Sequence, residues 1–408
     1  MAWFAALFPS PDVRKPLTLE VFLKELAPVF VLYYINALLV LIDGTLIIRL
    51  ALSPITSWLA FCAATQLDVA AGLDPRFAYL NQGLVLAMTT LGMRVVIWAC
   101  QMKPYRRCVP SPKPKSRSPP NGKVPDVGGH LVRDSLDLCF NSRGHGWNWS
   151  DGLYVPVETR PLSRASFALY TFAAFVAGTI VFDCLHITVQ WFDPTFSLAT
   201  GGSIFDMSLP PIQRYMRSTL ITLLGGLVIY TSIQLCYHIG TLVGVLILQQ
   251  HPSQWPPLFE YPWKANSLSD FWAKYWHQVF RQCFIFLGSK PMRYIMGRTG
   301  AVMGAFFVSA MLHYLALWGM GKGTEFWTLG TFFMMMGVGV ILEGMWKELT
   351  GYRVGGILGK VWAAIWLVSW GQLLIDAYCR KGVVASVFFP EEYRPSLILW
   401  RLIHRGSK

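Results

Sequence analysis

The stretch AVMGAFFVSAMLHYLALWGM, from Ala301 to Met320, carries no acidic residue, lysine or arginine. A helix needs about 20 mainly apolar residues to cross the hydrocarbon core of a bilayer. This stretch is therefore predicted to be a membrane-spanning helix. It contains His313, and a titratable side chain inside a membrane span is costly and usually functional.

The composition of the whole chain is also strongly apolar. Of its 408 residues, 54% are hydrophobic and 14% are charged, and the mean hydropathy is +0.42. Such a composition predicts an all-α polytopic membrane protein with about seven to nine transmembrane helices, forming one domain over residues 1–408. An eighth span or a re-entrant segment is expected near residues 51–64 or within the overlong run 220–248. Seven spans are predicted at 26–50, 83–101, 167–185, 220–248, 301–318, 327–342 and 357–376.

The formal net charge of +13 comes from basic residues in the loops between the spans. This placement indicates membrane orientation and contact with anionic lipid, and it argues against nucleic acid as a partner. We expect the basic segments before residue 26, after residue 101 and from 264 to 298 to be cytosolic. No cleavable secretory signal is expected, and the predicted location is the endoplasmic reticulum membrane.

The one long polar insert begins at Lys103, and its first part is rich in proline, serine and lysine. Residues 103–135 are therefore predicted to be a flexible basic cytosolic loop. The eight cysteines stand singly, with no CxxC pair and no histidine set at the spacing of zinc ligands. We expect neither a disulfide framework nor a bound metal or cofactor.

A second pattern precedes the histidine-containing span. From Leu268 to Phe284, apolar residues recur at spacings of three and four, which predicts one amphipathic helix lying in the cytosolic interface. Ser267 is the expected N-cap. At 100° per residue His277 falls on the polar side. The pattern alone leaves open whether this helix is part of a site or only an aromatic-rich surface helix.

His313 has two readings as well. It can be a packed histidine that donates to a neighbouring helix, as can His186 and His238 in other spans. Its position favours function, because twelve residues from Ala301 place it roughly 18 Å deep at ~1.5 Å per residue. A lipophilic molecule from the bilayer and a thin donor from the cytosol can both reach that depth. Ser309 lies one turn earlier and is expected to orient the ring or line the tunnel.

Three phrases together resemble the membrane-bound O-acyltransferase superfamily, in particular its wax-synthase-like branch. They are RGHGWNW (143–149), SLSDFWAKYWHQ (267–278) and SAMLHYLALWGM (309–320). The first resembles a phrase of fungal members that acylate terpenoid or meroterpenoid hydroxyls. The resemblance implies that His313 is the intramembrane histidine of the family. It also implies that His277 occupies the position after the aromatic phrase where relatives carry Asn or His. Relatives usually read FWGRRW, whereas Ala273, Lys274 and Tyr275 stand in the middle here.

The roles implied by the resemblance are those of acyl transfer. His313 is the expected general base, because an imidazole titrates near neutrality and a hydroxyl is a poor nucleophile. His277 is expected to bind the thioester carbonyl or the pantetheine arm. Acyl-CoA is expected as a co-substrate. The remaining predicted contacts with substrate or coenzyme A are Trp272, Trp276, Lys274, Arg281, Arg143 and Ser309, with the basic residues meeting phosphates.

The predicted function is transfer of an acyl group, with acetyl favoured, from acyl-CoA to a hydroxyl of a lipophilic secondary metabolite. A long-chain wax-ester synthase is the first alternative. A transporter with a path along His313, Glu343 and Asp376 is another, although these two acids are expected to be structural partners near helix ends. A membrane terpenoid cyclase using Asp43, Asp183 and Asp376 is the last. The acyl length and the acceptor alcohol stay open.

Overall fold

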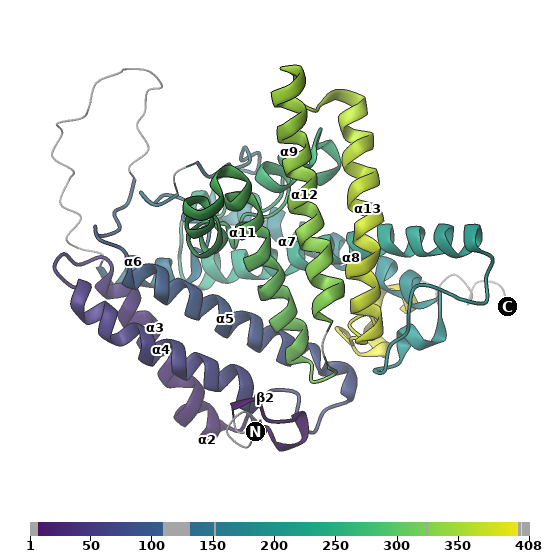
Figure 1. Ribbon diagram of the computed structural model, residues 1–408. Coiled ribbons are helices and arrows are strands. Elements are labelled where there is room, and N and C mark those ends of the chain that lie inside the picture. Colours follow the sequence, from purple (N-terminus) through teal and green to yellow (C-terminus); the bar gives the residue numbers. More distant parts are fainter. Residues whose placement is uncertain (1–6, 109–130, 151, 324, 399–400, 402–408) are drawn as a thin grey trace.

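A computed structural model describes residues 7–108, 131–150, 152–323, 325–398 and 401 of the chain. Almost all regular structure in these ranges is helical (Figure 1). The one exception is a parallel pair of two-residue strands, β1 (Lys15–Pro16) and β2 (Leu67–Asp68), which ties the N-terminal segment to the end of α4. The predicted all-α class is confirmed.

Eight helical segments of the described residues are long and apolar enough to cross a membrane, which confirms a multi-pass membrane protein. Three shorter elements matter for the site: α6 (Leu131–Phe140), α9 (Leu268–Asp270) and α10 (Arg281–Cys283). The long helices are α2 (Leu19–Val21) continued by α3 (Ala27–Leu39), α4 (Leu46–Gln66), α5 (Tyr79–Ala99), α7 (Arg164–Gln190), α8 (Pro211–Leu242), α11 (Lys290–Gly319), α12 (Phe326–Thr350) and α13 (Gly356–Arg380).

The predicted span over residues 26–50 is wrong. The chain turns between α3 and α4, and Gly44 adopts a φ of +76° in that turn. Asp43 beside it forms an ion pair with Arg106 at 2.8 Å. An Asp-Gly pair is a turn signal. The prediction missed it because the apolar residues on both sides gave a continuous hydrophobic run. The eighth span expected near residues 51–64 is confirmed as part of α4, and the 220–248 run belongs to one continuous helix, α8, extended by a π-helical turn.

The predicted flexible loop over residues 103–135 falls mainly on residues 109–130, which lie outside the described residues. On one side of it Tyr105 is buried, and on the other side α6 begins at Leu131. Residues 131–135, which the prediction placed in the loop, are helical and belong to α6.

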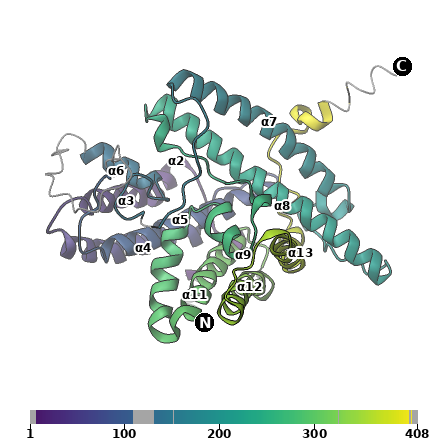
Figure 2. The same cartoon turned by 90° about the horizontal axis from the view of Figure 1, so that it is seen from above.

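The long helices follow one another around a curve. Each helix packs on the next in the order α4, α5, α11, α12, α13, α8 and α7. In Figure 1, α11, α12 and α13 stand side by side and upright, while α7 and α8 run across them. Figure 2 shows α9 inside the curve, between α8 on one side and α11 and α12 on the other. The inside of this curve contains the candidate site.

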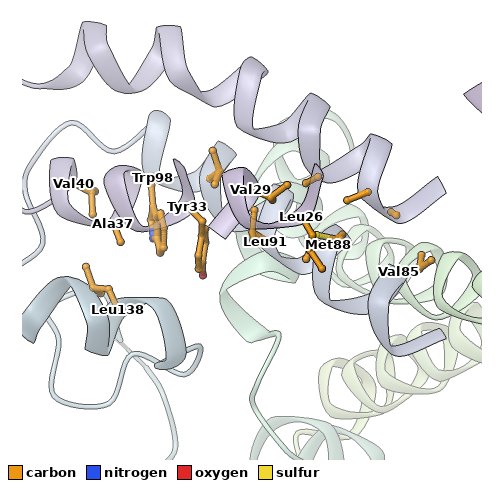
Figure 3. Packing of buried hydrophobic residues seen from close by; sticks show 14 of the residues in the cluster. Leu26, Val29, Tyr33, Ala37, Val40, Val85, Met88, Leu91, Trp98 and Leu138 are labelled. Atoms are coloured by element: carbon orange, nitrogen blue, oxygen red, sulfur yellow. The ribbon is translucent and has the colours of Figure 1, made fainter. Parts of the chain in front are cut away.

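The largest apolar cluster lies where α3, α4, α5 and α6 meet (Figure 3). Tyr33 of α3 stacks on Trp98 of α5, with ring centroids 4.9 Å apart. Arg94 lies over the same Trp98 ring and donates to the carbonyl of Cys139 near the end of α6. A cation at the C-terminus of a helix is favourable, because unpaired carbonyls gather there. This cluster fixes α5, and α5 supports the back of α11.

The segment from Arg281 to Gly319 is a helical hairpin and not one straight span. Backbone angles leave the helical region at Met296 and Gly297, where φ of Gly297 is +61°. The two arms are packed backbone to backbone, because a Cβ on Gly288 would lie 2.1 Å from the carbonyl oxygen of Gly304. The arm from residue 298 to 319 carries His313.

We expect Gly288→Ala to separate the arms of this hairpin. The added methyl group meets a backbone oxygen that cannot rotate away, so the cost should be at least about 1–3 kcal/mol. The measurement is the melting temperature of the protein in detergent, which should fall by several degrees. Gly92→Ala is the matched control, since its Cβ meets nothing within 4 Å. An equal effect of both variants would contradict the backbone contact.

Candidate active site

A cavity of about 950 Å³ lies inside the curve of helices. Its walls come from α8, α11, α12, α13 and the irregular segment around residues 262–289, and most of its lining side chains are apolar. Sites for small lipophilic molecules have volumes of about 300–1,000 Å³ and few polar groups. The cavity therefore has the size and character of a ligand site.

The helices α8 and α13 close the cavity at one end and leave it open along one side. They touch where a Cβ on Gly225 would lie 3.0 Å from Ile375, and where one on Gly371 would lie 3.3 Å from Thr222. Three residues of this contact, Thr222, Gly371 and Ile375, also line the cavity. Leu223 and Leu227 line it while remaining 47% and 42% exposed, so this side opens to the outer, apolar surface.

The predicted continuous amphipathic helix over residues 268–284 is wrong. The segment forms α9, a π-helical turn over Phe271–Tyr275, an extended residue at Trp276 and then α10. The predicted Ser267 cap is confirmed, since its hydroxyl accepts from the Asp270 N–H at 3.0 Å. The helix ends because the Gln278 side chain donates to the carbonyls of Trp272 and Trp276 at 2.9 and 3.0 Å, which replaces helical hydrogen bonds.

This break changes the direction of His277. The polar, interfacial position expected from helical periodicity is wrong, because His277 lines the cavity. The rings of Trp276, Phe259 and Phe280 surround it at centroid distances of 5.5, 5.8 and 5.8 Å. Its Nδ1 is buried and has no hydrogen-bond partner among the described residues. A buried polar atom without a partner costs about 1–3 kcal/mol, which indicates a place where a ligand can bind.

The electrostatic surroundings keep this imidazole neutral. Burial, with smaller contributions from the neighbouring His313 and Arg143, lowers the pKa of His277 to about 3. The two histidines are thus close enough to interact through their charges. A neutral ring can donate one hydrogen bond without carrying a proton for transfer.

His313 lies on α11 and lines the same cavity. Its ring packs against Phe333 of α12 with a centroid distance of 4.5 Å. Its Nδ1 lies 2.8 Å from the carbonyl oxygen of Ser309. A carbonyl only accepts, so we assign the proton to Nδ1 and the lone pair to Nε2. No hydrogen bond to Nε2 occurs among the described residues, and a base with this tautomer is ready to take a proton.

The structure brings together most, but not all, of the predicted contact residues. Trp272, Trp276, Arg281 and Ser309 line the cavity with the two histidines. Trp272 packs edge-on against Phe306 of α11 at 5.7 Å. Lys274 is exposed outside the lining and pairs with Asp270 at 3.1 Å.

Arg143 lies outside the lining too, and it fastens the RGHGWNW phrase to a neighbouring loop. It donates to the carbonyls of Pro256 and Pro257 at 2.8 Å each and to the Tyr237 hydroxyl at 2.7 Å. Gly144 beside it has a φ of +76°, and a Cβ there would lie 2.4 Å from the Trp149 ring. The phrase therefore has a structural role in addition to the coenzyme contact predicted for Arg143.

Two cavity residues were missed by sequence reasoning. Arg298 of α11 and Lys360 of α13 both line the cavity. They are 62 residues apart in the chain, and the sequence showed each only as one of many basic residues near span ends. Their shared position depends on how α11 and α13 are placed around α12.

Glu343, Asp376 and His186, three other polar groups of the spans, have structural partners. Glu343 accepts from the backbone N–H groups of Leu268 and Ser269, and Asp376 accepts from Ser203 and Ile204. His186 donates to the Val384 carbonyl at 2.7 Å. The expected structural role of the two acids is confirmed. Among the described residues there is no group of three or more side chains able to hold a metal ion.

The geometry thus defines a multi-pass membrane protein with two histidines in one apolar cavity. The sequence model of the Membrane bound O-acyl transferase family matches residues 255–335, which include both histidines. "Acetyltransferase ataH" of Aspergillus terreus is 30% identical over 259 residues, which cover 56% of this chain and 85% of that protein. The chain belongs to the membrane-bound O-acyltransferase family, which confirms the resemblance seen in its motifs.

Two further relatives show the range of the family. "Acetyltransferase sirH" of Emericella nidulans is 24% identical over 255 residues, and the match covers 58% of this chain and 57% of that protein. "Long-chain-alcohol O-fatty-acyltransferase" of Simmondsia chinensis is 25% identical over 138 residues, or 31% of this chain and 39% of that protein. In these two comparisons the chain spans about half, or less, of its relative.

The lowered pKa of His277 predicts how stability depends on pH. Below pH 6.5 the unfolded chain protonates His277 while the folded protein does not, so stability falls as the pH drops toward 3. At pH 5 the loss should be about 2 kcal/mol relative to neutral pH. His277→Asn should remove this contribution, and His251→Asn, at an exposed site, is the control. Melting temperatures between pH 7 and pH 5 test this, and parallel decreases in all three proteins would contradict it.

Proposed function

We propose that the protein transfers an acyl group, with acetyl favoured, from its coenzyme A thioester to a hydroxyl of a lipophilic secondary metabolite such as a terpenoid or meroterpenoid. The observation that carries the proposal is the apolar cavity of about 950 Å³ in which His313 and the neutral His277 both lie. The relatives named acetyltransferases support acetyl as the group transferred.

In this proposal His313 is the general base. The acceptor hydroxyl donates to Nε2, and this nitrogen takes the proton as the oxygen attacks the thioester carbonyl carbon. The carbon–sulfur bond of the tetrahedral intermediate then breaks, the ester forms and the coenzyme leaves as a thiolate. The proton passes from the imidazolium to the thiolate or to water. The Ser309 carbonyl holds Nδ1–H throughout and stabilises the imidazolium.

His277 is proposed to donate to the thioester carbonyl oxygen. Negative charge develops on this oxygen in the transition state, and a donor fixed in an apolar site stabilises it strongly. A neutral imidazole suits this task, because it donates without a competing proton transfer. The aromatic rings around His277 exclude water and hold the ring in place.

The two substrates are proposed to reach the histidines from different sides. The apolar opening beside Leu223 and Leu227 suits a lipophilic alcohol dissolved in the bilayer. The basic residues Arg281, Arg298 and Lys360 on the cavity wall suit the phosphates of coenzyme A. The endoplasmic reticulum remains the predicted location of the protein.

A long-chain ester synthase is the second candidate. The cavity is larger than an acetyl group requires, and one relative is named a fatty-acyltransferase of long-chain alcohols. The deciding experiment supplies membranes containing the protein with labelled acetyl-CoA or longer acyl-CoA, together with a pool of terpenoid and long-chain alcohols. Mass spectrometry of the lipid extract identifies the ester. A transporter or a cyclase would yield no labelled ester in any combination.

The first variant to test is His313→Ala. Loss of the base should lower the transfer rate by about 10²–10⁴-fold, and His277→Ala should lower it by about 100-fold. Rates are measured in membranes with equal amounts of folded protein. His238→Gln is the matched control, because this histidine lies in α8 outside the cavity lining. Near-normal transfer by the His313 variant would refute the mechanism.

The coenzyme contacts are tested by removing charge. Arg298→Gln and Lys360→Gln should each raise the KM for acyl-CoA about threefold to tenfold while changing kcat little. The effect should shrink at high salt, because salt screens phosphate contacts. Lys290→Gln is the control from the same helix outside the lining. The same assay on Lys274→Gln and Arg143→Gln tests the coenzyme contacts predicted for those two residues. Unchanged KM values in Arg298→Gln and Lys360→Gln would exclude binding of the acyl-CoA phosphates by Arg298 and Lys360.

A further inference from the structure

Glu343 of α12 is buried, with 7% exposure, and binds the start of the segment that carries His277. Its carboxylate accepts from the Leu268 N–H at 2.6 Å, from the Ser269 N–H at 2.9 Å and from the Trp362 indole N–H of α13 at 3.1 Å. No ion pair of Glu343 occurs among the described residues. Burial of a carboxylate is costly without such donors, so the segment can move from this position only at a large cost.

The contact completes the hydrogen bonding at the start of α9. The first four N–H groups of a helix have no partner within the helix. Here Leu268 and Ser269 donate to Glu343 and Asp270 donates to the Ser267 hydroxyl, while Phe271 makes the first helical bond, to the Ser267 carbonyl. The three N–H groups that follow the cap are therefore satisfied, and two of them depend on one side chain of another helix.

Close packing around Glu343 leaves no room for adjustment. A Cβ on Gly339, one turn before Glu343, would lie 2.5 Å from the Leu268 side chain. A Cβ on Gly359 of α13 would lie 2.2 Å from the Asn266 carbonyl oxygen. Leu268 itself has no exposed surface. The helices α12 and α13 thus pack closely against residues 266–269.

The far end of the segment is fixed separately. Gln278, which is 8% exposed, holds the carbonyls of Trp272 and Trp276. His277 therefore lies between a fixed start at Glu343 and a closed turn at Gln278. Helix α12 also touches His313 through Phe333, ten residues before Glu343, or about 15 Å along the helix. One rigid helix therefore contacts the base at one point and holds the segment of His277 at another.

We propose that Glu343 is a positioning residue, which sets the place of His277 relative to His313 by holding the start of α9 against α12. Glu343 does not line the cavity, so it acts through the segment and not on the substrate. The proposal rests on the proposed function, since it assigns Glu343 an effect on the transfer rate. It adds a residue that no resemblance of sequence motifs indicates.

The test compares Glu343→Gln with the parent protein in the transfer assay, with the acyl-CoA and alcohol that give most ester. Glutamine keeps the size of the side chain, but its amide N–H₂ is a donor and cannot accept from a backbone N–H. One of the two hydrogen bonds from Leu268 and Ser269 is therefore lost. A small displacement of a catalytic group can cost about 10²-fold in rate, so we expect kcat to fall about 10- to 100-fold. The KM for acyl-CoA should stay within about threefold, because no coenzyme contact is removed.

A double variant distinguishes positioning from a general loss of stability. If Glu343 acts through His277, then adding Glu343→Gln to His277→Ala should lower kcat by less than about threefold, because interacting residues are not additive. Asp376→Asn is the matched control. This buried carboxylate of α13 also accepts from a backbone N–H, but it holds residues 203–204 and lies outside the cavity lining. The Asp376→Asn substitution should lower the melting temperature without lowering kcat.

Three results would overturn the proposal. The first is a kcat of Glu343→Gln within twofold of the parent value. The second is a full, multiplicative loss of kcat when Glu343→Gln is added to His277→Ala. The third is a loss of kcat in Asp376→Asn equal to that in Glu343→Gln. Failure of the proposed function is recognised separately, because in that case the parent protein itself yields no labelled ester. Failure of the proposed mechanism is recognised by His313→Ala and His277→Ala variants that leave the transfer rate unchanged.

Discussion

A polar group buried in an apolar helix bundle needs a partner within the protein, and this constraint determines where the fold can be irregular. The partners are often side chains at helix ends. Arg14 donates to the Gly319 carbonyl at the end of α11, and Arg217 donates to the Phe192 carbonyl beyond α7. At the site, Glu343 and Gln278 replace backbone hydrogen bonds around the π-helical turn. The irregular backbone that places His277 in the cavity is stable only because these side chains satisfy it.

The two histidines depend on this arrangement in different ways. His313 lies in a regular helix, and its own helix supplies the Ser309 carbonyl that fixes its tautomer. His277 lies in a segment that is helical only in part, and its position depends on contacts with α12 and α13. A regular helix holds the His313 ring without help from distant residues. His277 follows a break in the helix and needs the surrounding tertiary structure, which is why the role proposed for Glu343 concerns His277.

The proposed mechanism separates the two histidines from the walls of the cavity. In it the histidines need only a hydroxyl and a thioester carbonyl between them, whereas the walls on α8 and α13 bound the space for the alcohol and the acyl chain. The relatives include proteins named acetyltransferases and one named a long-chain-alcohol fatty-acyltransferase. Substrate choice in this protein is therefore expected to depend on residues of α8 and α13 and not on the two histidines.

The sequence by itself determined the features that depend on local pattern. Apolar run lengths predicted the membrane class and the approximate number of spans, and the polar group in an apolar run pointed to His313. The Ser267 cap was also predicted correctly. Only the tertiary structure decided the break at Gly297, the direction of His277 and the presence of Arg298 and Lys360 in the lining of one cavity. A prediction from periodicity assumes an unbroken helix. The helix of residues 268–284 is broken by a hydrogen bond of Gln278, and its start is held by Glu343 of α12. The Glu343 contact joins residues far apart in the sequence, so only the tertiary structure shows it.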